Sequence, residues 1–272
     1  LKIKEKHVSQ ILKKLLKFKL IEELKSYNNN LIKKFFYKFF KFVGDAFLTS
    51  YTQKLRKKDL DFFNPIHRYQ VDQFEECYKH FKKYFPTSML FNNHSDIREF
   101  SILEALENDT KKQQLFLEFG VATGSTINFF SKYLSNKKIF GFDNFTGNKE
   151  HWIGNKTRIK GAWNRGGKPP KVNNNVELII GDIQNTLDNF LAKNNYEINF
   201  VHIDVNTYET TKFILERLKP KLIKGSIIIF DDYYNLPGWK NGEHKAMTEV
   251  FSDSEFKYIA FHSGQIVSVK IL

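Results

Sequence analysis

Acidic residues stand at or beside the ends of the apolar runs in the second half of the chain. They are Glu118, Asp143, Asp182, Asp204, Asp231 and Asp232. Carboxylates can accept hydrogen bonds from ligand hydroxyl or amino groups, take a proton from a reacting hydroxyl, or bind a hard cation. If the runs are parallel strands, their carboxyl ends meet at one edge of a sheet, where ligands bind in such folds. The spacing therefore predicts one shared polar site.

A glycine turn opens this part of the chain. The apolar run 115–119 fits a buried strand, and Gly120 and Gly124 fit a tight turn where backbone approaches a ligand. We expect Thr123 or Ser125 to cap the next helix, whose free N–H groups can bind a polar ligand. The turn lacks both the full G-x-G-x-x-G fingerprint and the Lys-Ser/Thr of a P-loop, which argues against a triphosphate. An ordinary strand–turn–helix is the alternative.

Strands and helices alternate from residue 115 onward. Strands are expected over 115–119, 138–143, 176–181, 198–204 and 226–231, helices over 125–134, 183–193, 208–218 and 243–252, and a final antiparallel hairpin over 256–261 and 265–271. This alternation predicts a parallel sheet with helices on both faces. Two earlier helices are expected, one over 69–85 and one over 96–106 capped by Ser95.

Positive charge is concentrated near the N-terminus. Residues 1–60 contain 16 Lys and Arg against 5 Asp and Glu, whereas residues 61–272 contain 27 against 25. Two amphipathic patterns within residues 1–45 carry Leu or Phe on one face and Lys on the other. They predict helices that either pack on the body or in a homo-oligomer, or lie on an anionic membrane surface. The nearly neutral body argues against a nucleic-acid partner.

Composition divides the chain into a basic helical segment (1–60), a helical lead-in (61–110) and an α/β domain (111–272). No run reaches the roughly 18 uncharged apolar residues of a membrane span, and we find no signal-peptide pattern. Cys77 is the single cysteine, which excludes an internal disulfide or a Cys-based zinc cluster and points to a reducing compartment. We expect a cytoplasmic protein, with residues 1–45 on the cytoplasmic membrane face as the alternative.

Three of the acids have separate candidate roles in binding a ligand. Asp143 ends the second strand, where a carboxylate can accept both hydroxyls of a ribose; a turn-starting Asp before Asn144 is the alternative. Asp182 follows the third strand and is expected to meet an adenine amino group, to cap the next helix, or both. Glu118 is expected to hold the glycine turn or a ligand's ammonium group.

The other three acids end two strands that should be neighbours. Asp204, Asp231 and Asp232 would repel one another in one place unless a cation joined them. Oxygen ligands of this kind suit Mg²⁺ or Ca²⁺. The alternative is that the three side chains point apart.

Four motifs at these strand ends together resemble a known family. They read Glu-Phe-Gly-Val-Ala-Thr-Gly-Ser (118–125), Gly-Phe-Asp-Asn-Phe-Thr-Gly (141–147), Val-His-Ile-Asp-Val-Asn-Thr-Tyr-Glu-Thr-Thr (201–211) and Ile-Ile-Phe-Asp-Asp-Tyr (228–233). The combination resembles the TylF (macrocin O-methyltransferase) family of class I S-adenosylmethionine-dependent methyltransferases, over roughly residues 112–272. The resemblance implies a Rossmann-like seven-stranded methyltransferase sheet with its last strand antiparallel.

The resemblance also implies a site. S-adenosyl-L-methionine would contact the residues Glu118, Gly120, Val121, Thr123, Gly124, Ser125, Asp143, Asn144, Asp182 and Asp204. Mg²⁺ or another hard divalent cation would bind Asp204, Asp231 and Asp232. Family members methylate hydroxyls of sugars on natural products and related glycans, which implies a sugar or glycan acceptor. Asn206 stands where the family usually has a second acid, and Asn148 replaces an apolar residue.

Methyl transfer to a hydroxyl needs a base that takes the hydroxyl proton. Asp204 and His244 are the candidates, while His202 is interpreted as a packed core residue. Catechol-type relatives carry a Lys where Thr207 stands here, so a catechol-like small-molecule acceptor is a weaker alternative.

The insertion 144–175, with Trp152, Trp163 and Arg165, is interpreted as a substrate lid or else a flexible loop. A non-catalytic binding protein acting through its basic helices is the remaining alternative.

Overall fold

The computed structural model describes residues 38–39, 41–45, 64–108, 113–134, 136–149, 151–152 and 159–272. The chain divides into two compact units, residues 1–67 and residues 68–272. Most of the basic segment predicted over residues 1–60 lies outside the described residues. Residues 38–39 and 41–45 of that segment are described and are helical.

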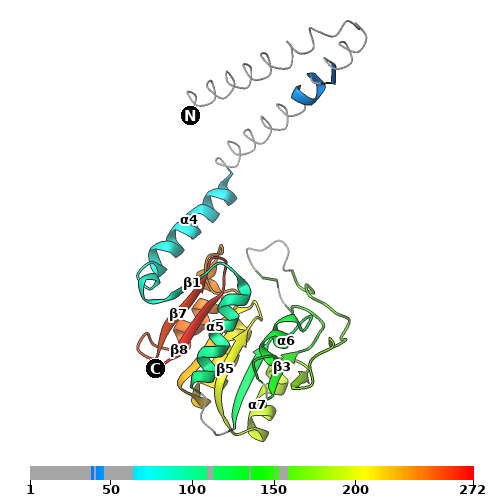
Figure 1. The fold of residues 1–272 in the computed structure, drawn as a ribbon, viewed down its shortest axis with the longest axis vertical. Helices are drawn as coiled ribbons and strands as arrows, with labels where there is room; N and C mark the ends of the chain where they lie inside the picture. The colour runs from blue at the N-terminus through cyan, green and yellow to red at the C-terminus, as the bar shows by residue number, and fades with distance from the viewer. Residues whose placement is uncertain are drawn as a thin grey trace, which may run out of the picture. The chain divides into compact units, whose positions relative to one another are not determined.

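The second unit is built on an eight-stranded sheet (Figure 1). In spatial order the strands are β1 (Met89–Phe91), β7 (Phe256–His262), β8 (Val267–Ile271), β6 (Leu222–Phe230), β5 (Glu197–Ile203), β2 (Gln114–Phe119), β3 (Ile139–Asp143) and β4 (Val176–Ile180). All neighbours pair in parallel except β8, which is antiparallel to both β6 and β7. The predicted fold class and the antiparallel last strand are confirmed.

The predicted count of seven strands was one short. The extra strand is β1, which adds to the outer edge of β7 through the pairs Met89 with Ala260 and Phe91 with His262. Met89 and Leu90 are both exposed, so this three-residue strand has no alternation of buried and exposed side chains. A period-two pattern cannot reveal a strand of that kind.

Helices cover both faces of the sheet, as the alternation predicted. They are α4 (Pro65–Phe81), α5 (His94–Glu107), α6 (Ser125–Ser131), α7 (Ile183–Lys193), α8 (Tyr208–Leu218) and α9 (Glu243–Val250), with short turns η1 (Phe85–Thr87), η2 (Lys219–Lys221) and η3 (Trp239–Asn241). Alternate residues of β2 serve different cores: Leu115, Leu117 and Phe119 pack with α7, α8 and α9, whereas Phe116 packs with α5 and α6. This alternation follows from the period of two along a strand.

Three helix starts differ from the predictions. α4 runs over Pro65–Phe81 rather than 69–85, and Asn64 accepts a hydrogen bond from the Ile66 N–H at its start (2.9 Å). Asn93, not Ser95, is the N-cap of α5. α6 is capped by Gly124 in a left-handed conformation (φ 77°) without a side-chain hydrogen bond, so neither predicted hydroxyl caps it. Here backbone conformation replaces side-chain capping.

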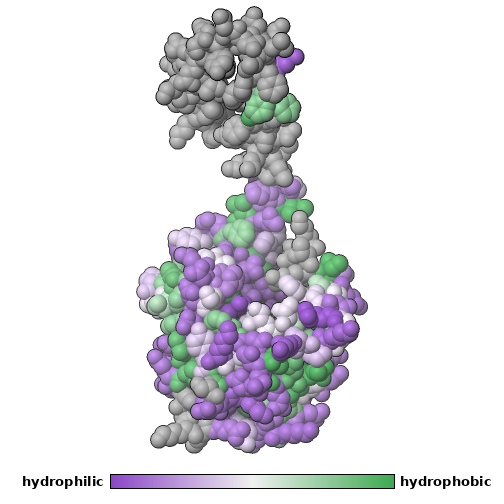
Figure 2. All heavy atoms as spheres, turned by 45° about the vertical axis from the view of Figure 1, so that its right-hand side comes forward, coloured by the Kyte–Doolittle hydropathy of each residue, from purple (hydrophilic) through white to green (hydrophobic). Residues whose placement is uncertain are grey.

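On the face drawn in Figure 2 the described residues are mostly hydrophilic, with apolar residues in small groups. Among the described residues, no helix combines the length and apolar character needed to cross a membrane.

Candidate functional site

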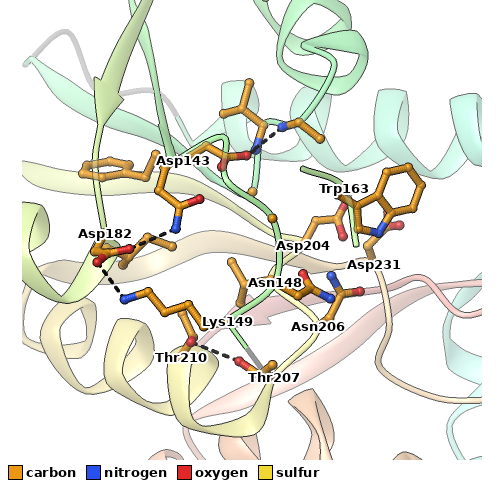
Figure 3. A pocket seen from close by; sticks show the side chains of 18 of the residues that line it. Asp143, Asn148, Lys149, Trp163, Asp182, Asp204, Asn206, Thr207, Thr210 and Asp231 are labelled. Atoms are coloured by element: carbon orange, nitrogen blue, oxygen red, sulfur yellow. Dashed lines mark hydrogen bonds and ion pairs between the residues drawn. The ribbon is translucent and has the colours of Figure 1, made fainter. Parts of the chain in front are cut away.

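A cavity of about 330 Å³ opens at the carboxyl ends of the central strands (Figure 3). The loops after β2, β3, β4, β5 and β6 all contribute to it, with residues that include Gly120, Val121, Thr123, Asp143, Asn144, Asp182, Asp204, Asn206, Thr207 and Asp231. The insertion after β3 adds Gly147, Asn148, Lys149 and Trp163. The structure therefore brings together most of the strand-end residues from which the sequence predicted a shared site.

The glycine turn lies directly against the end of β5. Gly120 has a left-handed backbone (φ 89°), and its N–H donates to the Phe142 carbonyl oxygen (2.9 Å). A Cβ atom at Gly120 would stand 2.0 Å from the backbone oxygen of Asp204. Only glycine fits here, because the position combines a positive φ with backbone contact.

Asp143 holds this turn in place. The N–H groups of Val121 and Ala122 donate to one of its carboxylate oxygens (2.9 and 2.8 Å), and the N–H of Phe145 donates to the other (2.7 Å). Each carboxylate oxygen can accept two hydrogen bonds, so the second oxygen keeps capacity for a ligand hydroxyl. The predicted contact with ribose stays a prediction, and the holding of the turn is a role that the sequence did not reveal.

Asp182 forms the opposite wall of the cavity. Its carboxylate accepts hydrogen bonds from Lys149 (2.8 Å) and from the Asn144 amide (2.9 Å), and these bonds lower the pKa of Asp182 below its usual value. Asp182 is the N-cap of α7, but no side-chain hydrogen bond caps the helix. An ionised carboxylate therefore faces the cavity and ties the insertion to α7.

A buried polar chain runs behind the cavity. His202 Nδ1 lies 3.1 Å from Glu118 Oε2, His202 Nε2 lies 3.6 Å from Asp231 Oδ1, and Arg98 Nη2 lies 2.8 Å from the same Asp231 oxygen. Glu118 and His202 are fully buried, and Glu118 does not line the cavity. The structure thus brings Glu118 to His202 rather than to the glycine turn or an open ligand site. Their pairing follows from register, because Glu118 and His202 are partners on β2 and β5.

Contacts within this polar chain determine whether His202 and Asp231 are charged. Burial disfavours a charged His202, yet the nearby Asp231 carboxylate and the hydrogen bond and charge of Glu118 raise the pKa of His202 to about 9. Burial alone would raise the pKa of Asp231, but the positive charge of His202 and the charge and hydrogen bond of Arg98 hold that pKa below its usual range. Asp231 therefore presents an ionised carboxylate to the cavity at neutral pH.

The pKa of Asp204 is shifted in the opposite direction from the pKa of Asp231. Burial first, and then the negative charges of Asp231 and Asp232, raise the pKa of Asp204 well above its ordinary value. Its side chain is half-buried at the cavity wall. A carboxylate in this environment holds an accepted proton more firmly than an exposed aspartate does.

The predicted magnesium site is not supported. No group of three or more His, Cys, Asp or Glu side chains is placed to hold a metal ion within the part of the chain that the structure describes. The Asp231 carboxylate is already paired with Arg98 and His202. Asp232 does not line the cavity, and its N–H donates to Glu243 (2.9 Å). Arg98 and His202 supply positive charge that the sequence pattern had attributed to a cation.

His244 lies outside the cavity lining. Its ring is packed among aromatic rings, with centroids 4.7 Å from Trp239, 5.3 Å from Tyr233 and 5.6 Å from Phe81. Burial first, and then the charges of His80 and Lys240, lower the pKa of His244 to about 4. The structure does not bring this candidate base to the site, because the buried face of α9 carries it into the aromatic core.

The insertion reaches the cavity through part of its length. Trp163 lines the cavity, whereas Trp152 packs against the main core and Arg165 is exposed away from the lining. Sequence patterns singled out Trp163 but missed Lys149 and Arg98. Nothing near Arg98 in the sequence indicates its partner, which lies 133 residues further along the chain.

Comparison with known proteins adds a family match. Residues 117–233 match the family model Methyltransf_24, described as a methyltransferase domain. Residues 117–233 therefore form a methyltransferase domain. A comparison with curated proteins found no match.

Comparison with solved structures found similar chains. CalS11, described as a calicheamicin methyltransferase, is 23% identical, with a TM-score of 0.54 and coverage of 82% of this chain and 91% of that chain. An apo structure of CalS11, described as a TDP-rhamnose 3'-O-methyltransferase, is 24% identical, with a TM-score of 0.48 over 65% and 77% of the two chains. The O-methyltransferase NovP is 18% identical, with a TM-score of 0.47 over 65% and 78%. None of these findings identifies the TylF family in particular.

Proposed function

We propose that this chain transfers the methyl group of S-adenosylmethionine to a hydroxyl of a sugar, a glycan or a glycosylated natural product. The observation that carries the proposal is the division of one cavity into two sides. Asp143 and Asp182 form one side, Asp204 and Asp231 form the other, and the glycine turn lies between them against the backbone of Asp204. The first side suits a nucleoside, and the second suits a hydroxyl that must lose a proton. The shared fold with CalS11 agrees with this assignment.

The nucleoside side offers donors and acceptors in the expected places. The backbone of Gly120 and Val121 leaves room for close approach, because Gly120 has no side chain. One oxygen of Asp143 retains capacity for a ribose hydroxyl, and Asp182 with Asn144 can meet an adenine amino group. These contacts are the ones that S-adenosylmethionine would need.

The transfer itself is an in-line displacement. The acceptor oxygen forms a bond to the methyl carbon while the carbon–sulfur bond breaks, and S-adenosylhomocysteine leaves with the electron pair. The hydroxyl proton passes to the Asp204 carboxylate. Asp204 is better suited to accept that proton than Asp231, because Asp231 is stabilised in its ionised form by Arg98 and His202. The chain's own residues thus supply positioning and the base.

The test separates cofactor binding from transfer. S-adenosylmethionine is titrated calorimetrically into the wild-type chain and Asp204→Asn, and transfer of labelled methyl groups is then measured on a panel of sugars that includes TDP-rhamnose. We expect binding to change by less than about threefold, and transfer by Asp204→Asn to fall by a factor of about 10²–10⁴. Asp188→Asn, on the exposed face of α7, is the matched control and should behave as wild type. Absence of S-adenosylmethionine binding by the wild-type chain would contradict the proposal.

A further inference from the structure

Trp163 is held in an unfavourable conformation at the mouth of the cavity. Its side chain is 57% exposed, and its backbone lies in the left-handed region (φ 65°). A bulky non-glycine residue seldom adopts this conformation, and an exposed indole forgoes the stabilisation of burial. Residues kept in such a state are concentrated at ligand sites, where the surrounding structure compensates for the cost.

Backbone pairing within the insertion positions Trp163. The N–H of Asn148 donates to the Ala162 carbonyl (2.9 Å), and the N–H of Gly161 donates to the Asn148 carbonyl (2.8 Å). The two segments approach so closely that a Cβ atom at Gly147 would stand 2.5 Å from the Ala162 oxygen. Hydrogen bonds between these two segments of the insertion therefore fix the backbone next to Trp163.

The same pairing presents an unsatisfied donor. Asn148 lines the cavity, and its buried Nδ2 atom has no hydrogen-bond partner among the described residues. Leaving a buried amide donor unpaired costs about 1–3 kcal/mol, so the site is completed when a ligand accepts that bond. Asn148, Trp163, Asp204, Asn206 and Asp231 all line this cavity and are labelled in Figure 3.

We propose that Trp163 and Asn148 form the subsite that holds the acceptor sugar, an inference that rests on the proposed function. The indole packs against the apolar C–H face of a pyranose ring, and the Asn148 amide donates to one ring hydroxyl. A neighbouring hydroxyl then faces Asp204. This combination of an aromatic face, an amide donor and a carboxylate matches a sugar ring, which carries apolar and hydroxyl surfaces together.

Charge around the cavity favours an uncharged ring over a phosphate at this subsite. Lys149 is the one basic side chain in the cavity lining within the described ranges, and it is paired with Asp182 on the nucleoside side. Asp204 and Asp231 line the same cavity as Trp163 and Asn148. A phosphate placed there would meet these carboxylates, because the positive charges of Arg98 and His202 are already paired with Asp231.

The test measures sugar binding apart from cofactor binding. The full chain is saturated with S-adenosylhomocysteine and titrated with methyl α-L-rhamnopyranoside and TDP-rhamnose, with saturation-transfer NMR as the readout. Trp163→Ala should weaken sugar binding about tenfold or more, Trp163→Phe should restore part of it, and Asn148→Ala should also weaken it. Ile159→Ala is the control, because Ile159 is exposed on the same insertion but does not line the cavity.

Two results would overturn the inference. One is wild-type sugar affinity in Trp163→Ala, and the other is no saturation transfer to either sugar with the wild-type chain. Calorimetric titration of S-adenosylmethionine and thermal melting accompany each variant. If the wild-type chain binds S-adenosylmethionine and methylates a sugar while Trp163→Ala is unaffected, only the subsite fails. If S-adenosylmethionine does not bind, the proposed function fails with it.

Discussion

Asp143 shows how one carboxylate can organise a binding turn. It accepts three backbone N–H groups, two from the glycine turn and one from the segment that follows β3. These bonds join β2 and β3 at the edge of the cavity. The residue type was predicted from its position at a strand end, but its partners depend on the folded turn.

Replacement of Asp143 by Asn should loosen the turn. Asparagine has one acceptor oxygen, so an N–H group that Asp143 now satisfies would face an amide donor instead. We expect a loss of about 1–3 kcal/mol in the free energy of unfolding and a dissociation constant for S-adenosylmethionine raised about tenfold. Urea denaturation and calorimetric titration measure the two effects. Unchanged values for both would contradict the role assigned to Asp143.

At the scale of elements, the site depends on the contact between the turn after β2 and the end of β5. Gly120 touches the backbone of Asp204, so the glycine turn and the candidate base are positioned by the same contact. Register between β2 and β5 brings Glu118 opposite His202 behind that contact. Two neighbouring parallel strands therefore determine both the floor of the cavity and the charge behind it.

Comparison of two glycines tests this contact. Gly120→Ala combines a positive φ with a Cβ 2.0 Å from a backbone oxygen, whereas Gly238 has a positive φ (77°) and open space around its Cβ. We expect Gly238→Ala to cost about 1–2 kcal/mol and Gly120→Ala about 2–5 kcal/mol of unfolding free energy. Urea denaturation provides both values. Equal costs would show that the contact between the turn and β5 is not restrictive.

At the scale of the whole molecule, an aromatic cluster joins α4, α9, η3 and the loop after β6. His244 lies in this cluster, and its pKa of about 4 lies below the ordinary value of 6.5. The unfolded chain therefore binds a proton at His244 before the folded protein does as the pH falls. The contribution of the neutral ring is present above pH 6.5 and is lost progressively between pH 6.5 and pH 4.

The measurement is the free energy of unfolding at pH 7.5 and pH 5.0. Between these values His244 should account for a loss of about 2 kcal/mol in the wild-type chain. His244→Phe keeps an aromatic ring and removes the titration, so its stability should fall less over the same interval. Burial also lowers the pKa of His80, which leaves some pH dependence in the variant. An identical pH dependence in both proteins would contradict the assignment.

The cellular location of the protein and its association with membranes or further copies also concern the whole molecule. Cytoplasmic location, membrane contact through residues 1–45 and homo-oligomer formation stay predictions, because most of that segment lies outside the described residues. The described sheet and cavity belong to residues 68–272.

The sequence by itself determined the order of the helices and of strands β2 to β8, though not β1, and the presence of a polar site at the strand ends. These features depend on local patterns: apolar runs that fit strands, glycines at Gly120 and Gly124, and acids such as Asp143 and Asp204 placed after the runs. Each is encoded within a few neighbouring residues, since backbone period and turn conformation are local properties. The fold class therefore follows from local patterns alone.

The tertiary structure alone decided what each acid does. Arg98 reaches Asp231 across 133 positions, and Glu118 meets His202 across 84. Pairing of this kind depends on which helix covers which strand and on register across the sheet, neither of which leaves a local pattern. Charge also depends on burial, so Asp204 and Asp231 differ in pKa although both follow a central strand. Solvent exposure and long-range neighbours are properties of the folded chain, and the sequence therefore located the acids without distinguishing their roles.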